Sequence, residues 1–406
     1  MRILLANEFF YPDVMGGTPK VLSELARALR DGYGDEIDVV TSMNSYRDPS
    51  VRFSPWEKWD GIRIHRLNTP HWSQKSTPQR LLGNLLFTRR AAARMQRIPA
   101  DVALISSAPT TLPAAGRRLK VPYVYVLYDL DPDRAVVVGV TEMGSLPERT
   151  LRRHQRRWLH GAARVVVIGR CMRRYVSETY GVPLERIDVV EVGADPLTVR
   201  PLPKASAFRR EHGIAGFVVL YSGNFGKYHD FDTVLNAANL LEDVTFVLVG
   251  RGAKKAHLES RVAAEGIRNV RLFDFVPEEA YADLLASADV SLVTLEAGME
   301  GLCVPSKFYS ILASGRPALA AMRPEAEVAY VLQEADCGRR VDLNDSEALA
   351  NAVRTMQADP EGLEQMGANA RRAFDEKYTT AACAARFREA LARVVGQRSQ
   401  EGKQRE

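Results

Sequence analysis

Short apolar runs rich in Val, Ile and Leu alternate with longer helical patterns along nearly the whole chain. Each short run has the length of a buried strand, and the longer patterns place apolar residues on one face of a helix. Parallel neighbouring strands need a crossover connection, which is usually a helix, so this alternation predicts an α/β fold with parallel sheets. Strands are expected at 2–6, 37–41, 102–106, 123–127, 165–168, 218–222, 245–249, 270–273, 290–294 and 318–321, and early helices at 19–30 and 171–180.

The alternation stops once, in a proline-rich stretch from Gly193 to Pro203 that suits neither a helix nor a strand. The chain has 406 residues, 46% of them apolar, which is enough for two cores. We therefore predict two Rossmann-like domains, at 1–195 and 196–375, that face each other across a cleft. A helix at 376–395 is expected to cross back to the first domain, and the polar tail at 396–406 is expected to be disordered.

Compartment is indicated by three features of the sequence. No apolar run reaches the roughly 18 residues of a membrane-spanning helix, and the apolar part of the N-terminus is too short for a secretory signal. The cysteines show no Cys-x-x-Cys spacing, which argues against a zinc site and a disulfide framework. They are Cys171, Cys303, Cys337 and Cys383. We expect a cytoplasmic protein.

Charge is distributed unevenly along the chain. Residues 1–200 contain 30 Lys and Arg against 21 Asp and Glu, a net charge of +9, whereas the remainder contains 25 and 29, a net charge of −4. The arginines gather around 89–97 and 149–157, where helical spacing puts several on one flank. Such a flank attracts anionic lipid headgroups, so peripheral contact with the inner face of a membrane is one expectation, and a solvated helix face is the other. Stacking aromatics do not interleave the arginines, so no nucleic-acid partner is expected.

The stretch 298–317, GMEGLCVPSKFYSILASGRP, follows the expected strand at 290–294. Pro305 and Ser306 suit the start of a helix, with Ser306 as the N-cap residue and Lys307 in the first turn. The amides and partial positive charge of a helix start, together with a lysine, favour a bound diphosphate. This stretch therefore predicts an anion-binding site.

A second loop, 223–227, carries Gly-Asn-Phe-Gly-Lys between the strand at 218–222 and the next helix. Its glycines would allow backbone amides to approach phosphate closely, although an ordinary tight turn would have the same glycines.

Taken together, these strings resemble the nucleotide-sugar site of retaining glycosyltransferases of family 4, which have the GT-B fold of two facing Rossmann-like domains. More narrowly, they resemble a branch that adds sugars during surface-polysaccharide assembly, and the resemblance extends over nearly the whole chain. It implies transfer of a hexosyl or N-acetylhexosaminyl group, with retention, from a nucleoside-diphosphate sugar, for which UDP is the expected nucleotide. The acceptor would be a hydroxyl of a glycan or lipid-linked molecule. The resemblance implies no metal or other cofactor.

The resemblance also implies roles for individual residues. Lys227 and Lys307 would neutralise the departing diphosphate, and Glu300 would touch the donor sugar unless it is only an exposed loop carboxylate. His229 falls where many relatives carry a lysine, so it is either a partial cation or a surface histidine. The implied donor-binding residues are Gly16, Gly17, Gly223, Asn224, Gly226, Gly250, Arg251, Phe275, Val276, Leu302, Val304, Ser306 and Ser310.

At one position the sequence departs from the family pattern. Most relatives carry Glu-x7-Glu, whose second glutamate grips the ribose, but counting back from Gly315 puts Ser310 at that position. A hydroxyl can donate one hydrogen bond but cannot accept two ribose hydroxyls as a carboxylate can. A catalytically degenerate subunit that binds sugar nucleotides is therefore an alternative to the active transferase.

The acceptor side is expected in the first half. The loop that contains Gly16 and Gly17 leads into the first helix, and Asp129 begins a run of three alternate carboxylates after the strand at 123–127. Asp129 would orient the acceptor hydroxyl or cap the following helix. A nucleotide-dependent epimerase or dehydrogenase would instead need Gly-x-Gly-x-x-Gly after the first strand, which residues 7–20 lack.

Overall fold

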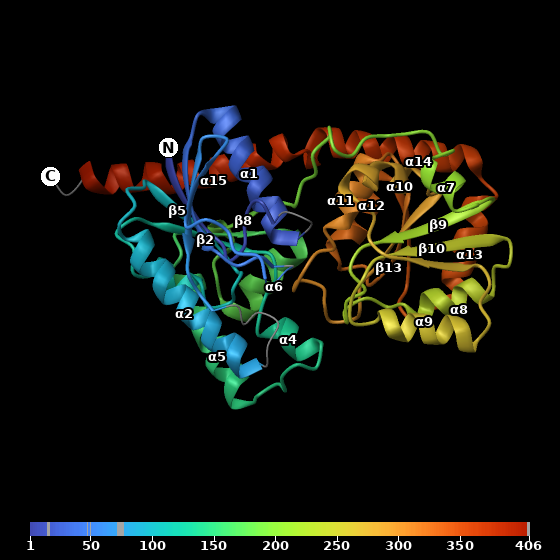
Figure 1. Cartoon of the computed structure of the whole chain (residues 1–406), viewed down its shortest axis with the longest axis horizontal. Helices are drawn as coiled ribbons and strands as arrows, with labels where there is room; N and C mark the ends of the chain where they lie inside the picture. Colours follow the sequence, from blue (N-terminus) through green and yellow to red (C-terminus); the bar gives the residue numbers. More distant parts are fainter. Residues whose placement is uncertain (14–16, 47, 49, 71–76, 404–406) are drawn as a thin grey trace. The chain divides into compact units, whose positions relative to one another are not determined.

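The computed structural model describes residues 1–13, 17–46, 48, 50–70 and 77–403, and the chain divides into two compact units (Figure 1). The first unit comprises Met1–Val192 and the segment that begins at Thr380, and the second comprises Gly193–Thr379. The proline-rich stretch from Gly193 to Pro203 lies outside every helix and strand, and the second unit starts at its first residue.

The first unit is built on an eight-stranded sheet in the order β3-β4-β2-β1-β5-β6-β7-β8. Only β3 is antiparallel to its neighbour, and the other pairs are parallel. The strands are β1 Arg2–Ala6, β2 Glu36–Ser42, β3 Trp56–Trp59, β4 Ile62–Leu67, β5 Val102–Ser106, β6 Tyr123–Leu127, β7 Arg164–Val167 and β8 Ile187–Val189. The helices are α1 Gly17–Tyr33, α2 Thr77–Met95, α3 Pro113–Gly116, α4 Asp133–Val137, α5 Leu146–Gly161, α6 Arg170–Tyr180 and α15 Thr380–Lys403.

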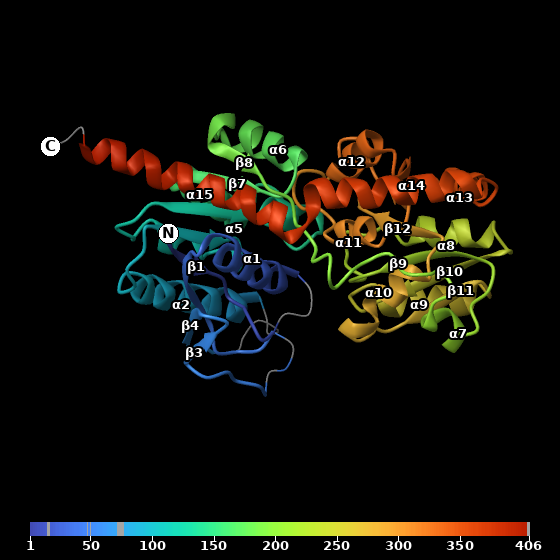
Figure 2. The same cartoon turned by 90° about the horizontal axis from the view of Figure 1, so that it is seen from above.

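The last helix, α15, completes the first unit by packing along α1 (Figure 2). α1 buries Leu22, Leu25, Ala26 and Leu29, whose spacing of three and four residues forms one apolar stripe. Arg388 of α15 also donates from Nε to Oδ2 of Asp35 at 2.7 Å, and the N-terminal amine of Met1 pairs with Oδ1 of the same fully buried carboxylate.

The second unit contains a six-stranded parallel sheet in the order β11-β10-β9-β12-β13-β14. In sequence order this is 3-2-1-4-5-6, the strand order of a Rossmann fold, and its direction reverses between β9 and β12. The strands are β9 Phe217–Ser222, β10 Val244–Val249, β11 Val270–Phe273, β12 Val290–Thr294, β13 Ala318–Ala321 and β14 Gly338–Val341. The helices are α7 Ala207–Glu211, α8 Asp232–Asn239, α9 Lys255–Ala264, α10 Tyr281–Ala286, α11 Lys307–Ala313, α12 Glu327–Ala335, α13 Ser346–Gln357 and α14 Pro360–Ala373.

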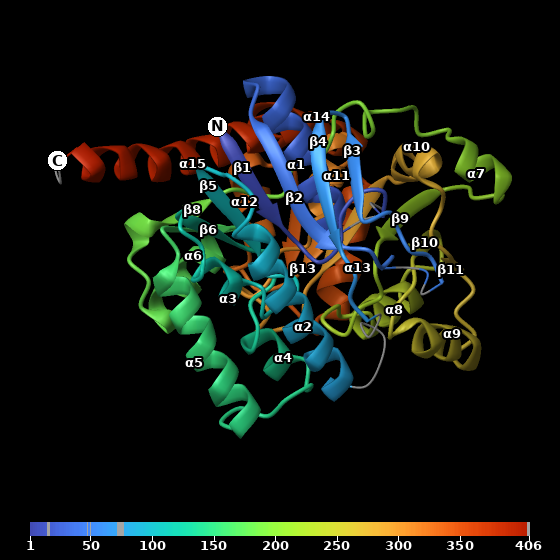
Figure 3. The same cartoon turned by 60° about the vertical axis from the view of Figure 1, so that its left-hand side comes forward.

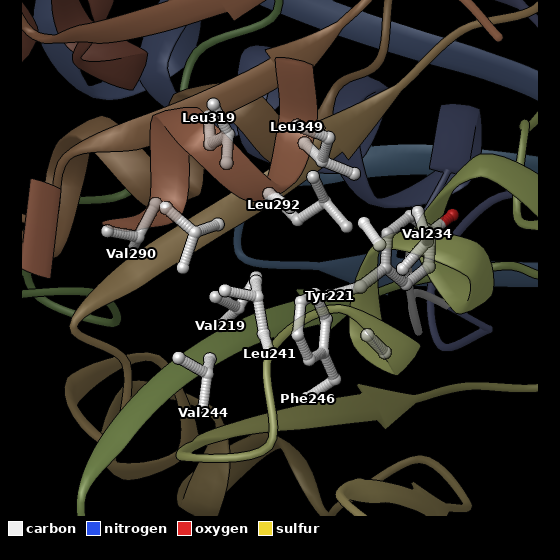
Figure 4. Close-up of a cluster of buried hydrophobic side chains, with 14 of the residues drawn as sticks. Val219, Tyr221, Val234, Leu241, Val244, Phe246, Val290, Leu292, Leu319 and Leu349 are labelled. Atoms are coloured by element: carbon white, nitrogen blue, oxygen red, sulfur yellow. The ribbon is translucent and has the colours of Figure 1, made fainter. Parts of the chain in front are cut away.

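The core of the second unit lies between this sheet and helices α8 and α13 (Figure 4). Val219 and Tyr221 of β9 face Val234 of α8 and Leu349 of α13, and all four side chains are fully buried. Each buried side chain of this size stabilises the fold by about 1.5–3 kcal/mol relative to an exposed one. This core fixes the carboxyl ends of β9 and β12, where the strand order reverses.

The predicted α/β fold of two units is confirmed, and the ten expected strands are present with ends that differ by at most one residue. Four strands escaped prediction, namely β3, β4, β8 and β14. They are edge or near-edge strands, and β4 and β14 alternate or interrupt their apolar residues with Arg or His, so their half-buried pattern differs from the continuous apolar runs of the centre.

The C-terminal prediction was wrong in two respects. The expected helix at 376–395 begins only at Thr380, after a π-helical turn at Phe374–Tyr378, and it continues to Lys403 through most of the expected disordered tail. A polar composition does not end a helix that is already nucleated on a packed surface, because each further residue only propagates it.

Candidate functional site

Two loops of the second unit meet at the point where the strand order of its sheet reverses. One follows β9 and runs from Gly223 to Lys227, and the other follows β12 and leads to Lys307 at the start of α11. Ligands of open α/β sheets bind outside the carboxyl ends of the strands at this point. The topology therefore brings together the two motifs that the sequence analysis selected separately.

The loop after β9 is interlocked with the loop after β10 through the backbone. The amide of Gly223 donates to the carbonyl of Val249 at 2.9 Å, and the amide of Phe225 donates to the carbonyl of Arg251 at 2.8 Å. A Cβ atom on Gly250 would lie 1.9 Å from the carbonyl oxygen of Gly223, which is impossible without moving one loop. Position 250 therefore requires glycine, and the two loops keep one geometry.

Lys307 lies directly beneath the turn at Gly223. A Cβ atom on Gly223 would lie 2.8 Å from both Cε and Nζ of Lys307, and Nζ lies 3.6 Å from the centroid of the Tyr221 ring. Nζ is shielded from solvent and has no hydrogen-bond partner in the part of the chain that the structure describes. Burial without a counter-charge lowers the pKa of Lys307 well below its usual value.

The start of α11 differs from the sequence expectation. Ser306 occupies the N-cap position, but its backbone is helical and its exposed side chain caps no amide. A capping side chain reaches the amides of the first turn only from an extended backbone, and here the amides of Phe308 and Tyr309 bond to the carbonyls of Pro305 and Ser306. α11 is also only seven residues long, so the positive charge at this point comes chiefly from Lys307.

Two further lysines and two glutamates lie in the segments that follow β9, β10 and β12. Lys227 is exposed and makes no ion pair with any described residue, so it is free to meet an anion. Lys254 donates from Nζ to Oε1 of Glu296 at 3.0 Å and to the carbonyl of His229 at 2.6 Å. Glu300 accepts from the amide of Gly298 at 2.8 Å through Oε2, while its Oε1 is shielded and has no partner among the described residues.

Neither sequence interpretation of His229 is correct. The side chain is 3% exposed, and its Nδ1 lies 2.7 Å from the carbonyl oxygen of Thr294. Burial and the nearby cations Lys307 and Lys254 lower the pKa of His229 well below its usual value, so the ring is neutral. It is a buried core histidine and supplies no positive charge.

The remaining donor-side residues lie on or beside the same loops. Arg251 pairs with Asp274 at 3.2 Å, one residue before the half-exposed Phe275, and these groups therefore come together from the ends of β10 and β11. Asn224 is exposed, and its carbonyl accepts from the Tyr221 hydroxyl at 2.7 Å. The buried residues of the set are Gly226, Gly250, Leu302 and Val304, and the partly exposed ones are Gly223, Val276 and Ser310.

In the first unit, Gly17 begins α1 with φ +66°, and Gly16 lies outside the described residues. Asp129 follows β6, where its Oδ2 lies 3.5 Å from Nη1 of Arg134. Desolvation by the surrounding protein raises the pKa of Asp129, and Arg134 opposes that rise, although 46% of the side-chain surface is exposed. Asp129 caps no helix, because α4 has Pro132 at its N-cap position.

The other two carboxylates of the run differ in their partners. Asp131 shares Arg134 with Asp129, at 3.2 Å, and accepts from Thr110 at 3.1 Å. The buried Asp133 instead accepts from Tyr175 at 2.7 Å and pairs with Arg152 at 2.8 Å. Two of the three carboxylates therefore converge on an arginine, and the third points to other partners. Across the described ranges, no group of three or more His, Cys, Asp or Glu is arranged to hold a metal ion.

Sequence reasoning missed Glu8, which lies two residues beyond the end of β1. Its amide donates to the carbonyl of Ala108 at 2.9 Å, while Ser107 next to it accepts from the amide of Asp129 at 3.4 Å. Glu8 and Asp129 thus flank the same loop after β5. Burial raises the pKa of Glu8 to about 7. The sequence signal that could have found Glu8 is its position just past a buried strand, at the carboxyl edge of the sheet beside β1 and β5.

The described residues contain no helix that is both long enough and apolar enough to span a bilayer. The basic clusters on α2 and α5 are surface features of the first unit.

Comparison with known proteins agrees with this arrangement. The model of the glycosyl transferase 4-like domain matches residues 16–193, and that of the glycosyl transferases group 1 matches residues 206–373. The chain is 30% identical over 276 residues to WbjE of Pseudomonas aeruginosa, assigned as a glycosyltransferase, and this match covers 66% of the chain and 68% of WbjE. It is 27% identical over 335 residues to WcaI of Escherichia coli K12, assigned to colanic acid biosynthesis, covering 78% of the chain and 82% of WcaI.

Among solved structures, that of HepE from Anabaena in complex with UDP is similar, with a TM-score of 0.72 and 17% sequence identity. The superposition covers 97% of this chain and 100% of HepE, and at this identity it shows a shared fold. The two family models, the match to WbjE and the common fold agree with one another. The chain therefore belongs to the glycosyltransferases of the GT-B fold that join a glycosyl transferase 4-like domain to a group 1 domain.

Proposed function

We propose that this glycosyltransferase moves a hexosyl or N-acetylhexosaminyl group from a UDP-sugar to a hydroxyl of a glycan or lipid-linked acceptor, with retention at the anomeric carbon. The reaction would serve the assembly of a cell-surface polysaccharide on the cytoplasmic side of the membrane. No metal or other cofactor takes part in the proposed reaction.

The observation that supports this proposal best is the amino group of Lys307 beneath Gly223, which is shielded from solvent and has no hydrogen-bond partner among the described residues. An unpaired buried cation is costly to the folded protein and is explained if an anion joins it during function. A diphosphate in the loop at Gly223–Lys227 would meet Lys307 from below and the exposed Lys227 from the side. Electrostatic stabilisation of a developing charge is typically worth about 2.7–4 kcal/mol for each well-placed donor.

The relatives support the choice of substrate. HepE has been crystallised with UDP and with UDP-glucose, and WcaI is assigned to colanic acid biosynthesis. In the proposed reaction the C-terminal unit binds the nucleotide sugar, Glu300 contacts its sugar, and the acceptor hydroxyl attacks the anomeric carbon on the face from which the diphosphate leaves. Asp129 would orient that hydroxyl.

A panel of nucleoside diphosphates and sugar nucleotides, assayed by thermal shift, tests the donor. Specific binding raises apparent stability by RT ln(1 + [L]/Kd), so UDP and one UDP-sugar should raise the melting temperature and other nucleotides should not. Release of UDP that depends on a lipid-linked acceptor, and is unchanged by EDTA, would support transfer without a metal. Anomeric NMR of the product tests retention.

The Lys307→Met variant tests where the diphosphate binds. We expect its affinity for UDP to fall far more than its affinity for uridine, because only UDP carries the charge that Lys307 would neutralise. Lys120→Met, at an exposed site of the first unit, is the control and should bind both ligands as the wild type does. Equal losses for UDP and uridine would place the diphosphate elsewhere.

Ser310 suggests a second candidate function, because a serine at this position lacks the carboxylate that most relatives use to hold the ribose. A degenerate subunit would bind the sugar nucleotide without acceptor-dependent release of UDP. If Ser310 lies at the ribose, Ser310→Glu should tighten UDP binding roughly tenfold, since a hydrogen bond to a charged group contributes about 1.5–3 kcal/mol. Ser260→Glu, at an exposed position of α9 in the same unit, is the matched control for adding a carboxylate. Unchanged UDP affinity in Ser310→Glu would show that the ribose lies elsewhere.

A further inference from the structure

Two segments of the first unit expose large apolar side chains. Leu81, Leu82 and Leu85, near the start of α2, are 53%, 50% and 50% exposed. The segment from the end of α4 to the start of α5 adds Val137, Val140, Met143 and Leu146, and the last two are 75% and 79% exposed. Isolated exposed apolar residues are ordinary, but these seven are nearly half of the fifteen found among the described residues.

The loop between α4 and α5 is held in place by hydrogen bonds. The amide of Val140 donates to the carbonyl of Ala135 at 2.8 Å, and the amide of Gly144 donates to Oε2 of the buried Glu148 at 3.1 Å. Ser145 caps α5 by accepting from the amide of Glu148. The loop therefore presents Met143 and Leu146 outward from a defined conformation.

The exposed face of α5 that begins at Leu146 is basic. Arg149, Arg153 and Arg157 recur every four residues on this face, all are exposed, and none of their side chains makes an ion pair or hydrogen bond within the described part of the chain. Arg152, on another face of the helix, is instead paired with Glu148 and Asp133. The three arginines thus continue the apolar loop, and of the three only Arg149 is known to act on a carboxylate of the protein, since it helps to lower the pKa of Glu148.

Figures 1 and 3 both show α4 and the starts of α2 and α5 gathered at one end of the first unit. We propose that these elements form a membrane-docking surface, made of the seven apolar residues and the three unpaired arginines of α5, which binds an anionic phospholipid bilayer. The apolar side chains enter the boundary between headgroups and acyl chains, and the arginines pair with lipid phosphates.

The chemistry of the surface favours a bilayer over an acidic protein partner. Long arginine side chains can lie along apolar material and still reach phosphate, which suits a helix lying at a lipid interface. The docking surface is separate from the proposed donor site in the second unit. It goes beyond sugar transfer, because it states where the enzyme works and not what it transfers.

Flotation of the full-length protein with vesicles tests the surface. Wild-type protein should float with phosphatidylglycerol-containing vesicles and far less with pure phosphatidylcholine vesicles, and high salt should weaken but not abolish binding. Met143→Ser with Leu146→Ser should lower the partition coefficient at least roughly tenfold at both salt concentrations, because each buried CH₂ contributes to membrane affinity. Leu184→Ser with Leu197→Ser, two exposed leucines elsewhere, should float as the wild type does.

The arginines are tested in the same assay. Arg149→Gln, Arg153→Gln and Arg157→Gln together should lower binding at low salt and remove most of its salt dependence. The control variant removes the same charge through Arg97→Gln, Arg117→Gln and Arg118→Gln. These arginines are exposed, and they lie just after the opposite end of α2 or further along the chain. Equal losses of vesicle binding in both triple variants would show that only the net charge matters, and would overturn the assignment of this surface.

A fluorescence measurement tests the same surface with only one of its residues changed. The four native cysteines are buried, so Met143→Cys can be labelled with an environment-sensitive nitrobenzoxadiazole fluorophore, and Leu197→Cys serves as the control. The emission at position 143 should shift to the blue on anionic vesicles while that at 197 stays unchanged. No shift at 143, or a concentration-dependent shift without vesicles that reports a protein partner or a second copy, would overturn the proposal. UDP binding is measured in a separate assay, so failure of the membrane-docking proposal and failure of the proposed donor binding can be told apart.

Discussion

At the scale of single residues, the environment of Lys307 disfavours its charged form. Its pKa is lowered by burial, so the unfolded chain binds more protons than the folded one between that lowered pKa and 10.5. Stability therefore rises with pH through this window and is reduced by the charge at lower pH. A bound diphosphate would reverse the effect, because it favours the ammonium form.

This linkage predicts that Lys307→Met separates stability from binding. The variant should melt at a higher temperature than the wild type without ligand, since it removes a buried amino group that has no hydrogen-bond partner among the described residues, yet it should bind UDP roughly 10- to 100-fold more weakly. Calorimetry in buffers of different ionisation enthalpy should detect proton uptake when UDP binds the wild type and none in the variant. A lower melting temperature for the variant would contradict the inference that the buried amino group of Lys307 destabilises the free protein.

Glu8 gives a pH prediction of the opposite sign. With a folded pKa of about 7 against a usual 4.5, the folded state binds more protons than the unfolded state between these values. Stability should therefore fall, by on the order of 3 kcal/mol, as pH rises from about 4.5 to 7. Glu8→Gln should remove this part of the pH dependence in chemical denaturation. Glu178→Gln, at an exposed position of the same unit, should leave it in place.

Residue identity alone could locate part of the site. Lys307 and the glycines of the 223–226 loop stood out because small residues and a cation follow strands directly, and the structure brings them together. The neutral state of His229 and the raised pKa of Glu8 could not be read from the sequence, because both depend on burial by residues distant in the chain. The role of Ser306 failed for a local reason, since its helical backbone keeps the hydroxyl from the amides.

At the scale of elements, the glycines between strands and helices decide how closely the loops approach. Gly250→Ala should destabilise the second unit by roughly 3 kcal/mol or more, as overpacking against a backbone does, and should abolish UDP binding. Gly32→Ala in α1 is the matched control, because a Cβ atom there meets nothing within 4 Å. That substitution should stabilise the protein by up to about 1 kcal/mol. Thermal unfolding and UDP titration of both variants check the pair.

The central elements were predictable because both faces of their strands are covered. β1, β5, β6, β12 and β13 have the predicted ends, since continuous apolar runs leave little choice of register. β3 and β4 form an antiparallel pair at the edge of the sheet. Trp56 is 55% exposed there, so the apolar pattern of the sequence does not match the burial of the side chains. The exposure of the apolar loop after α4 could not be predicted from the sequence either, because the identity of an apolar residue does not show whether the fold covers it.

At the scale of the whole molecule, two separately built units predict a divided response to ligand. UDP should slow hydrogen exchange in the loops after β9, β10 and β12 and in the strands that carry them. Its binding at 100 times Kd would add about 2.7 kcal/mol to the stability of the unit that binds it. The strands of the first unit should exchange at the same rate with and without UDP. Equal protection in both units would show that they do not respond as separate bodies.

The interrupted sequence of the first unit also constrains how the protein is made. Its sheet and α1 emerge from the ribosome first, but α15, which covers the apolar stripe of α1 and supplies Arg388 to Asp35, begins only at Thr380. The whole of Gly193–Thr379 is translated between them. A nascent chain therefore holds every residue of the second unit before it holds the helix that closes the first, so the unit that starts the chain is the last to be completed.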